Sequence, residues 1–262
     1  MKLSVHQLVA ILITIVLIVV FYFGCDIQSK DIKSAEKSRS TQMSTTSIEN
    51  IKKTTFDSLT PSQAAYYDGL QLQLSEAVYD EDKLTILKEL SGFWYQQGAY
   101  ALAGDVAKQI AEIEETADAW GIAGTTYAAG IMAGRNEKLR RFNQRNAINA
   151  FENAISLDPD DPSYSTNLAI CYAELPPEDN PMKGILMLLD LNKKYPENAG
   201  VLFQLGRLGI QTGQYEKAIA RLENALQLEP NMKKASCLLA IAYDKIGEPA
   251  KAAPHIVTCE KN

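Results

Sequence analysis

The feature that most constrains this chain is a recurring pattern of small side chains at a nearly fixed spacing. One set of small residues lies at Gly124, Ala169, Gly206 and Ala240. A second set lies at Ala147, Gly184, Ala218 and Ala252, and three prolines keep step with it: Pro159, Pro196 and Pro230. The last two members of each set are roughly 34 residues apart, a spacing typical of paired-helix repeats, and the first spacing in each set is longer. Because three independent markers agree on one period, we expect an array of paired helices with insertions in the earlier units.

The residue types fit close packing of two helices within each repeat. Helices approach closely only where the residues at their crossing are small, so we expect Gly206 to face Ala218. Large neighbours at helical spacing form an apolar stripe around that crossing: Leu202, Leu205, Leu222 and Leu226. Gly213 supplies a tight turn between the helices, and Pro230 ends the unit.

The segment Trp120-Gly-Ile-Ala-Gly124-Thr-Thr-Tyr127 resembles the first helix of the tetratricopeptide repeat family, with Ala123 where a leucine is usual. An earlier segment has Trp94 and Ala103 in register but carries Ala107 where a large apolar residue is common. The resemblance covers about residues 84–262 and implies an all-α solenoid of about five tetratricopeptide-like repeats. In this chain the solenoid would follow an N-terminal transmembrane helix. The expected units are 84–116, 117–161, 162–198, 199–232 and 233–262.

The wider sequence also resembles membrane-anchored tetratricopeptide proteins of the Bacteroidetes, and it includes the stretch Pro177-Glu-Asp-Asn-Pro-Met-Lys-Gly-Ile-Leu-Met-Leu-Leu. This second resemblance implies no biochemical activity.

The N-terminus contains an apolar run from Leu8 to Phe23 in which only Thr14 is polar. With its weakly polar neighbours the run approaches the roughly 20 residues that span a bilayer, so we expect a single membrane anchor within residues 1–25, contacting the membrane through residues 5–25. The alternative is a cleaved lipoprotein signal with a lipid on Cys25, although the run is longer than an ordinary signal.

The side of the membrane follows from charge and from cysteine usage. Four basic residues follow the run: Lys30, Lys33, Lys37 and Arg39. They slightly favour a cytoplasmic domain, and a periplasmic or lipoprotein form stays open. The odd number of cysteines in the domain also suits a reducing compartment. Cys237 and Cys259 lie in one unit and could pair, but their helical positions indicate different faces of the two helices, so we expect buried free thiols.

Residues 26–59 are rich in Ser, Thr and Lys, which predicts a flexible tether. Thr60-Pro-Ser-Gln63 then reads as a capping box, so we expect residues 60–83 to form a capping helix over the first repeat.

The sequence offers no catalytic, cofactor or metal constellation. Its only histidines are His6, near the apolar run, and His255, expected to be exposed in the last helix. A zinc site or a cysteine–histidine pair would need a second histidine in the domain. We therefore expect a protein that is not an enzyme.

An insertion between Tyr127 and Ala147 concentrates positive charge on a chain of net charge −6. Its basic residues are Arg135, Lys138, Arg140, Arg141 and Arg145. The alternatives are a solvated helical extension and a patch for an acidic partner, anionic lipid or nucleic acid. Nucleic acid is the least favoured, because Phe142 is the only interleaved aromatic residue.

The family resemblance implies that the first helix of each unit lines a concave face that binds peptides or helices. The residues it places there are Lys88, Tyr95, Thr125, Asn167, Phe203, Arg207, Lys234 and Lys245. The leading hypothesis is a membrane-tethered scaffold for an unidentified protein partner, and the alternative is an anionic-lipid or nucleic-acid binder using the basic insertion.

Overall fold

A computed structural model describes residues 47–260, and this part of the chain contains helices and no strands. The helices are α3 Ile48–Phe56, α4 Pro61–Glu76, α5 Asp80–Gln96, α6 Tyr100–Glu114, α7 Ala117–Ala133, α8 Glu137–Leu157, α9 Pro162–Glu174, α10 Lys183–Lys194, α11 Ala199–Gln211, α12 Tyr215–Leu228, α13 Lys233–Lys245 and α14 Pro249–Glu260. Within the described ranges, no helix is both long and apolar enough to cross a membrane.

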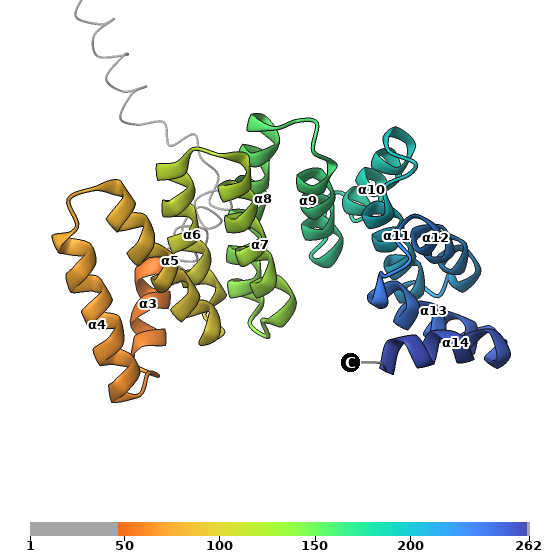
Figure 1. Cartoon of the computed structure of the whole chain (residues 1–262), viewed down its shortest axis with the longest axis horizontal. Coiled ribbons are helices and arrows are strands. Elements are labelled where there is room, and N and C mark those ends of the chain that lie inside the picture. The colour runs from red at the N-terminus through yellow and green to blue at the C-terminus, as the bar shows by residue number, and fades with distance from the viewer. Residues whose placement is uncertain (1–46, 261–262) are drawn as a thin grey trace, which may run out of the picture. The chain divides into compact units, whose positions relative to one another are not determined.

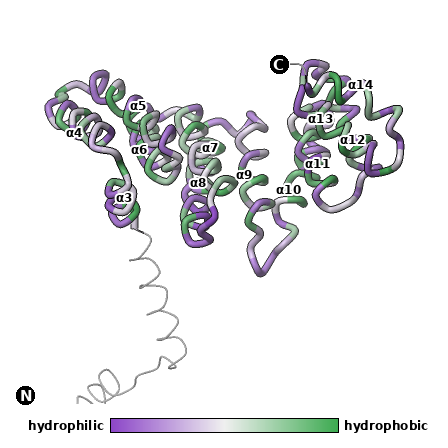
Figure 2. The backbone as a smooth tube through the Cα atoms, turned by 90° about the horizontal axis from the view of Figure 1, so that it is seen from below, coloured by the Kyte–Doolittle hydropathy of each residue, from purple (hydrophilic) through white to green (hydrophobic). Residues whose placement is uncertain are grey.

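From α5 onward the helices form five successive pairs, and each pair packs against the next (Figure 1). We call α5, α7, α9, α11 and α13 the first helices, and their partners α6, α8, α10, α12 and α14 the second helices. First helices of adjacent units touch from α7 to α13, and the second helices α6 and α8 also touch. Apolar and polar residues are interleaved along the helices (Figure 2), and buried apolar residues of neighbouring helices form shared core clusters along the stack. The predicted all-α repeat architecture is confirmed.

Three pairs turn through a glycine with positive φ. Gly98, Gly213 and Gly247 have φ of 70°, 74° and 77°, a region that residues with a Cβ rarely adopt. The turn predicted at Gly213 is therefore confirmed. Pro159, Pro196 and Pro230 each lie just past the end of a second helix, where a proline cannot continue the helix.

The small residues lie at close helix crossings. A Cβ on Gly124 would come within 2.6 Å of the Phe151 ring, and one on Gly184 within 2.4 Å of the Ala169 carbonyl oxygen. A Cβ on Gly206 would lie 2.6 Å from Leu222 and 3.4 Å from the Ala218 carbonyl oxygen. The predicted approach of Gly206 to Ala218 is confirmed.

The insertion between Tyr127 and Ala147 lengthens two helices. Helix α7 has 17 residues against 13 in α11, and α8 has 21 against 14 in α12. The added lengths correspond to about one and two helical turns at 3.6 residues per turn. The faces of both helices therefore stay in register with the rest of the array.

The N-terminal expectations are partly confirmed. Thr60 and Gln63 form the predicted capping box, with the Gln63 backbone N–H donating to the Thr60 hydroxyl over 3.3 Å. The cap expected over 60–83 is shorter, because α4 ends at Glu76 and α5 already begins at Asp80. The anchor predicted in 1–25 lies outside the described residues, as does the tether up to residue 46.

The flexible tether predicted for 26–59 is wrong for its last part, which forms α3. Ile48, Ile51 and Phe56 pack against the core cluster that contains Trp94. These apolar residues share one helix face at roughly helical spacing, and that packing outweighs the polar composition around them.

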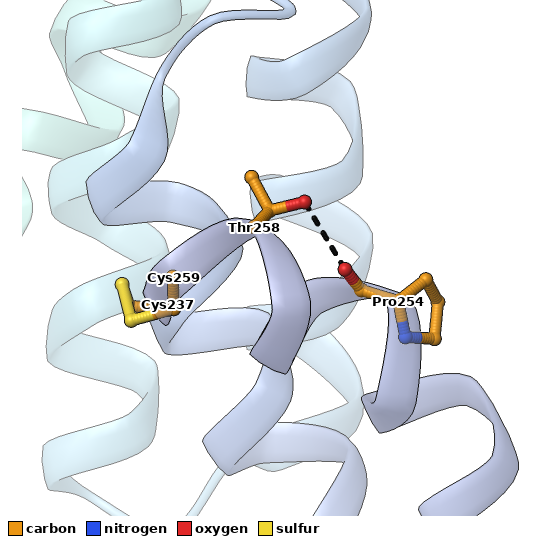
Figure 3. The surroundings of a disulfide bond; sticks show 4 residues. All are labelled: Cys237, Pro254, Thr258 and Cys259. Atoms are coloured by element: carbon orange, nitrogen blue, oxygen red, sulfur yellow. Dashed lines mark hydrogen bonds between the residues drawn. A yellow bond between two sulfur atoms is a disulfide. The ribbon is translucent and has the colours of Figure 1, made fainter. Parts of the chain in front are cut away.

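The expectation of free thiols at Cys237 and Cys259 is also wrong. The two form a disulfide with a Cα–Cα distance of 5.0 Å (Figure 3). Cys237 lies near the start of α13 and Cys259 in the last turn of α14. Because the two helices run in opposite directions, the start of one lies beside the end of the other. His255, expected to be exposed, is half-buried and stacks on Tyr243, with ring centroids 6.0 Å apart.

Candidate functional site

The first helices carry large apolar side chains that remain exposed. Ile122 and Met132 on α7 are 62% and 67% exposed, Tyr95 on α5 is 49% exposed and Ile241 on α13 is 46% exposed. Three of the five first helices thus carry large apolar side chains that the core does not bury, and exposed apolar side chains of this kind are found at binding faces. We call these four residues the first-helix face.

Two of the charged residues predicted for partner binding are held in ion pairs. Lys88 Nζ lies 2.8 Å from Glu114 Oε1. Arg207 Nη1 on α11 lies 2.7 Å from Glu174 Oε1 on α9, and the two side chains are only 17% and 19% exposed. The Arg207 pair thus links adjacent first helices and is a structural contact as much as a ligand group.

The other six predicted residues differ in surroundings. Phe203 is half-buried and packs against the core of the last two units, so it is not a free groove residue. Tyr95 is exposed and its ring packs edge-on against Tyr100, with centroids 5.0 Å apart. Thr125, Lys234 and Lys245 are exposed and Asn167 is half-buried.

The two lysines of α13 do not form one site. Lys234 is the second residue of α13 and Lys245 its last. At about 1.5 Å of rise per residue, they lie roughly 16 Å apart along the helix axis.

The basic insertion forms the tip of the α7–α8 pair, and one of its arginines points inward. Arg140 Nε donates to the Ile131 carbonyl oxygen over 2.8 Å, near the end of α7. Glu137 pairs with both Arg140 and Arg141, at 3.4 and 3.0 Å. Exposed positions are occupied by Arg135, Lys138, Arg141 and Arg145. Arg140 therefore binds the end of α7 and Glu137 offsets part of the charge, while the role of the basic insertion as a binding patch stays a prediction.

In the part of the chain that the structure describes, the polar and ionisable side chains of the core stabilise the fold and show no arrangement suited to catalysis. Burial raises the pKa of the Cys171 thiol to about 12, which keeps it protonated and unreactive. The hydroxyl of Tyr164 donates to Asp118 over 2.7 Å, and this bond raises the pKa of Tyr164 to about 12. Within residues 47–260, no three metal-ligating side chains gather in one place.

A hollow of about 480 Å³ lies where α6, α7 and α8 meet, and we call this place the open junction. Trp120 and Ala150 line it, together with polar residues of α6 and α8. Next to it, Ala107, Ala123 and Ala150 form a small buried cluster against which Trp120 packs. Sequence reasoning noticed Ala107 and Ala123 as departures from the family pattern but did not connect them to a cavity.

When the repeats are aligned, the place that corresponds to the open junction two units later is where α10, α11 and α12 meet. We call that place the closed junction. Counting from the marker residues of each helix, Leu188 takes the place of Ala107, Leu205 that of Ala123 and Arg221 that of Ala150. Leu188 and Leu205 are buried there.

Arg221 completes the filling of the closed junction. Its Nη1 donates to the Leu205 carbonyl oxygen over 3.2 Å, and burial lowers the pKa of its guanidinium. Three large side chains thus occupy the positions that carry three buried alanines beside the hollow in the earlier units.

A match to one family model agrees with the repeat architecture over part of the chain. A family model described as tetratricopeptide repeat matches residues 209–255, from the end of α11 into α14. A crystal structure of MamA protein has a TM-score of 0.43 and 17% identity, covering 67% of this chain and 89% of that one. A MamA structure from Desulfovibrio magneticus RS-1 has a TM-score of 0.43 and 18% identity, covering 70% and 95%. Neither likeness says anything about this chain's partners. Residues 209–255 thus match the tetratricopeptide repeat, and the paired helices with glycine turns have the repeat architecture of that family.

Proposed function

We propose that this protein is a membrane-tethered scaffold that binds a protein partner on its first-helix face. The observation that carries the proposal is the recurrence of exposed apolar side chains on α5, α7 and α13, at Tyr95, Ile122 and Ile241. Packing between the first helices from α7 to α13 supports a continuous surface. Because a helix or an extended peptide can contact several repeats at once, such a surface suits a partner segment better than a small molecule.

Membrane tethering is supported by the apolar run from Leu8 to Phe23. The Cys237–Cys259 disulfide bears on the compartment, since disulfides persist in oxidising environments and are rare in the cytosol. We therefore favour a domain on the extracytoplasmic side, in place of the cytoplasmic side that the charge distribution slightly favours.

Site-directed photocrosslinking in native membranes tests the scaffold proposal. A photoreactive residue at Ile122 samples the first-helix face, and one at Leu186 on α10 is the matched control, an exposed aliphatic residue on a second helix. We expect one dominant crosslinked protein from Ile122 and from Ile241, and none from Leu186. Equal crosslinking at all three positions, or none at Ile122 and Ile241, would contradict the proposal.

A further inference from the structure

The open junction is a second candidate binding site, separate from the first-helix face. Its volume of about 480 Å³ falls in the range of small-ligand pockets, and its lining residues come mainly from the second helices α6 and α8. The closed junction carries large side chains at the equivalent positions. The hollow therefore results from the residues of this one junction and is not a general feature of the repeat.

The lining of the open junction is rich in hydrogen-bond acceptors. Asn146 Nδ2 donates to the Phe142 carbonyl oxygen and Asn153 Nδ2 to the Asn149 carbonyl oxygen, each over 2.9 Å. Each amide nitrogen thus uses one of its two N–H groups on its own helix, which fixes the orientation of the amide. The amide oxygens of Asn146 and Asn153 accept no hydrogen bond within the described part of the chain, so both can accept one from a ligand.

The lining also carries an excess of negative charge. Glu112 Oε1 lies 3.4 Å from Lys108 Nζ, and the two charges compensate each other. Glu152 is exposed and makes no ion pair within the described part of the chain. One uncompensated carboxylate, several amide oxygens and the indole of Trp120 thus face the same hollow.

We propose that the open junction binds the guanidinium group of an arginine presented by a partner protein. A guanidinium is planar and permanently charged, carries five N–H donors and stacks on indole faces. It can therefore use Trp120, the Glu152 carboxylate and the amide oxygens together. A lysine ammonium has no plane to stack, and a neutral ligand such as a sugar gains nothing from the charge of Glu152. This site is independent of the first-helix face and does not rest on the function proposed for that face.

Intrinsic fluorescence provides the test, because the chain has only two tryptophans and Trp94 is 2% exposed in the core. The full-length protein in detergent micelles is titrated with a blocked peptide of one arginine flanked by glycines. The matched probe replaces arginine with citrulline, which keeps the shape and removes the charge. We expect a saturable change in fluorescence, with arginine bound about fivefold or more tightly than citrulline. The change should be absent in Trp120→Phe.

Two charge-neutralising variants distinguish binding at the open junction from non-specific attraction of the peptide to a negatively charged protein. Glu152→Gln should weaken arginine binding about fivefold. Glu216→Gln, an exposed glutamate on α12 outside the hollow, is the matched control and should leave binding unchanged. Equal affinity for citrulline, an unaltered response in Trp120→Phe, equal weakening by both glutamine variants, or no saturable change with either peptide would each overturn the proposal. Circular dichroism checks that every variant keeps its helix content.

Discussion

The open and closed junctions occupy equivalent places in one repeat frame and are filled in opposite ways. At the closed junction, Leu188 and Leu205 are buried and Arg221 reaches the Leu205 carbonyl oxygen. At the open junction, the corresponding positions carry alanines that form a small buried cluster with Trp120, and a hollow lined by Trp120 and Ala150 lies beside it. The comparison teaches that the small residues at helix crossings fix the frame, while the positions around them decide whether a junction is core or pocket.

The largest expected effect comes from opening the closed junction. Leu188→Ala removes a side chain that is 0% exposed and places there the residue found at position 107. We expect it to lower the free energy of unfolding by about 2–5 kcal/mol, through lost burial and the cavity left behind. Urea unfolding followed by circular dichroism measures the change. A loss below about 1 kcal/mol would mean that the closed junction does not depend on its leucines.

The second largest effect concerns the disulfide that links α14, the last helix, to α13. Replacing both Cys237 and Cys259 by serine removes a link that closes a sequence separation of 22 residues. The expected loss is about 3 kcal/mol, concentrated in α13 and α14. Hydrogen exchange measured helix by helix should show faster exchange there and unchanged exchange in α7 and α8. Unchanged protection of α14 in the variant would contradict this account.

A smaller effect compares the tolerance of added volume at the open junction with that of a buried cluster between α11 and α12. Ala225→Leu adds bulk to the buried cluster of Ala199 and Leu202 and should cost about 1–3 kcal/mol. Ala150→Leu extends into the hollow, so we expect a change within about 1 kcal/mol. Thermal unfolding of the two variants in parallel gives the comparison. Equal destabilisation would show that the open junction has no usable space.

The smallest effect is a pH dependence at α6, the helix that borders the open junction. Burial raises the pKa of Asp105 above its ordinary value of 3.8, although a hydrogen bond from Gln109 opposes the shift. A carboxyl with a raised folded-state pKa contributes most stability below pH 3.8, and that contribution is lost as the pH rises through the folded pKa. Asp105→Asn should therefore stabilise the protein at neutral pH and give no gain at pH 3. An equal gain at both pH values would exclude the titration as its cause.

The repeat frame could be predicted from the sequence because its markers have strict steric causes. Gly213 supplies a positive φ, and Gly184 leaves no room for a Cβ against the α9 backbone. Pro196 follows a helix end, and Thr60 with Gln63 forms a capping box. Each of these depends on local geometry alone, so a spacing pattern is enough to find it.

The features that could not be predicted depend on contacts between distant elements. The Cys237–Cys259 disulfide needs the arrangement of α13 against α14. Helix α3 is stabilised by packing of Ile48 against the core around Trp94. The spacing of its apolar residues can be read from the sequence, but this packing partner cannot. The open junction combines residues of three helices. Only the alignment of the repeats shows that Ala150 occupies the position that Arg221 has two units later, where the longer side chain reaches the Leu205 carbonyl oxygen.

The measurement that tests the account most directly is acrylamide quenching of each tryptophan by itself. Trp94→Phe leaves Trp120 as the reporter of the open junction, and Trp120→Phe leaves the buried Trp94. We predict that Trp120 is quenched several times more strongly than Trp94, and that adding Ala150→Leu lowers its quenching towards that of Trp94. Equal quenching of the two tryptophans, or quenching of Trp120 that Ala150→Leu leaves unchanged, would contradict the claim that this junction is open.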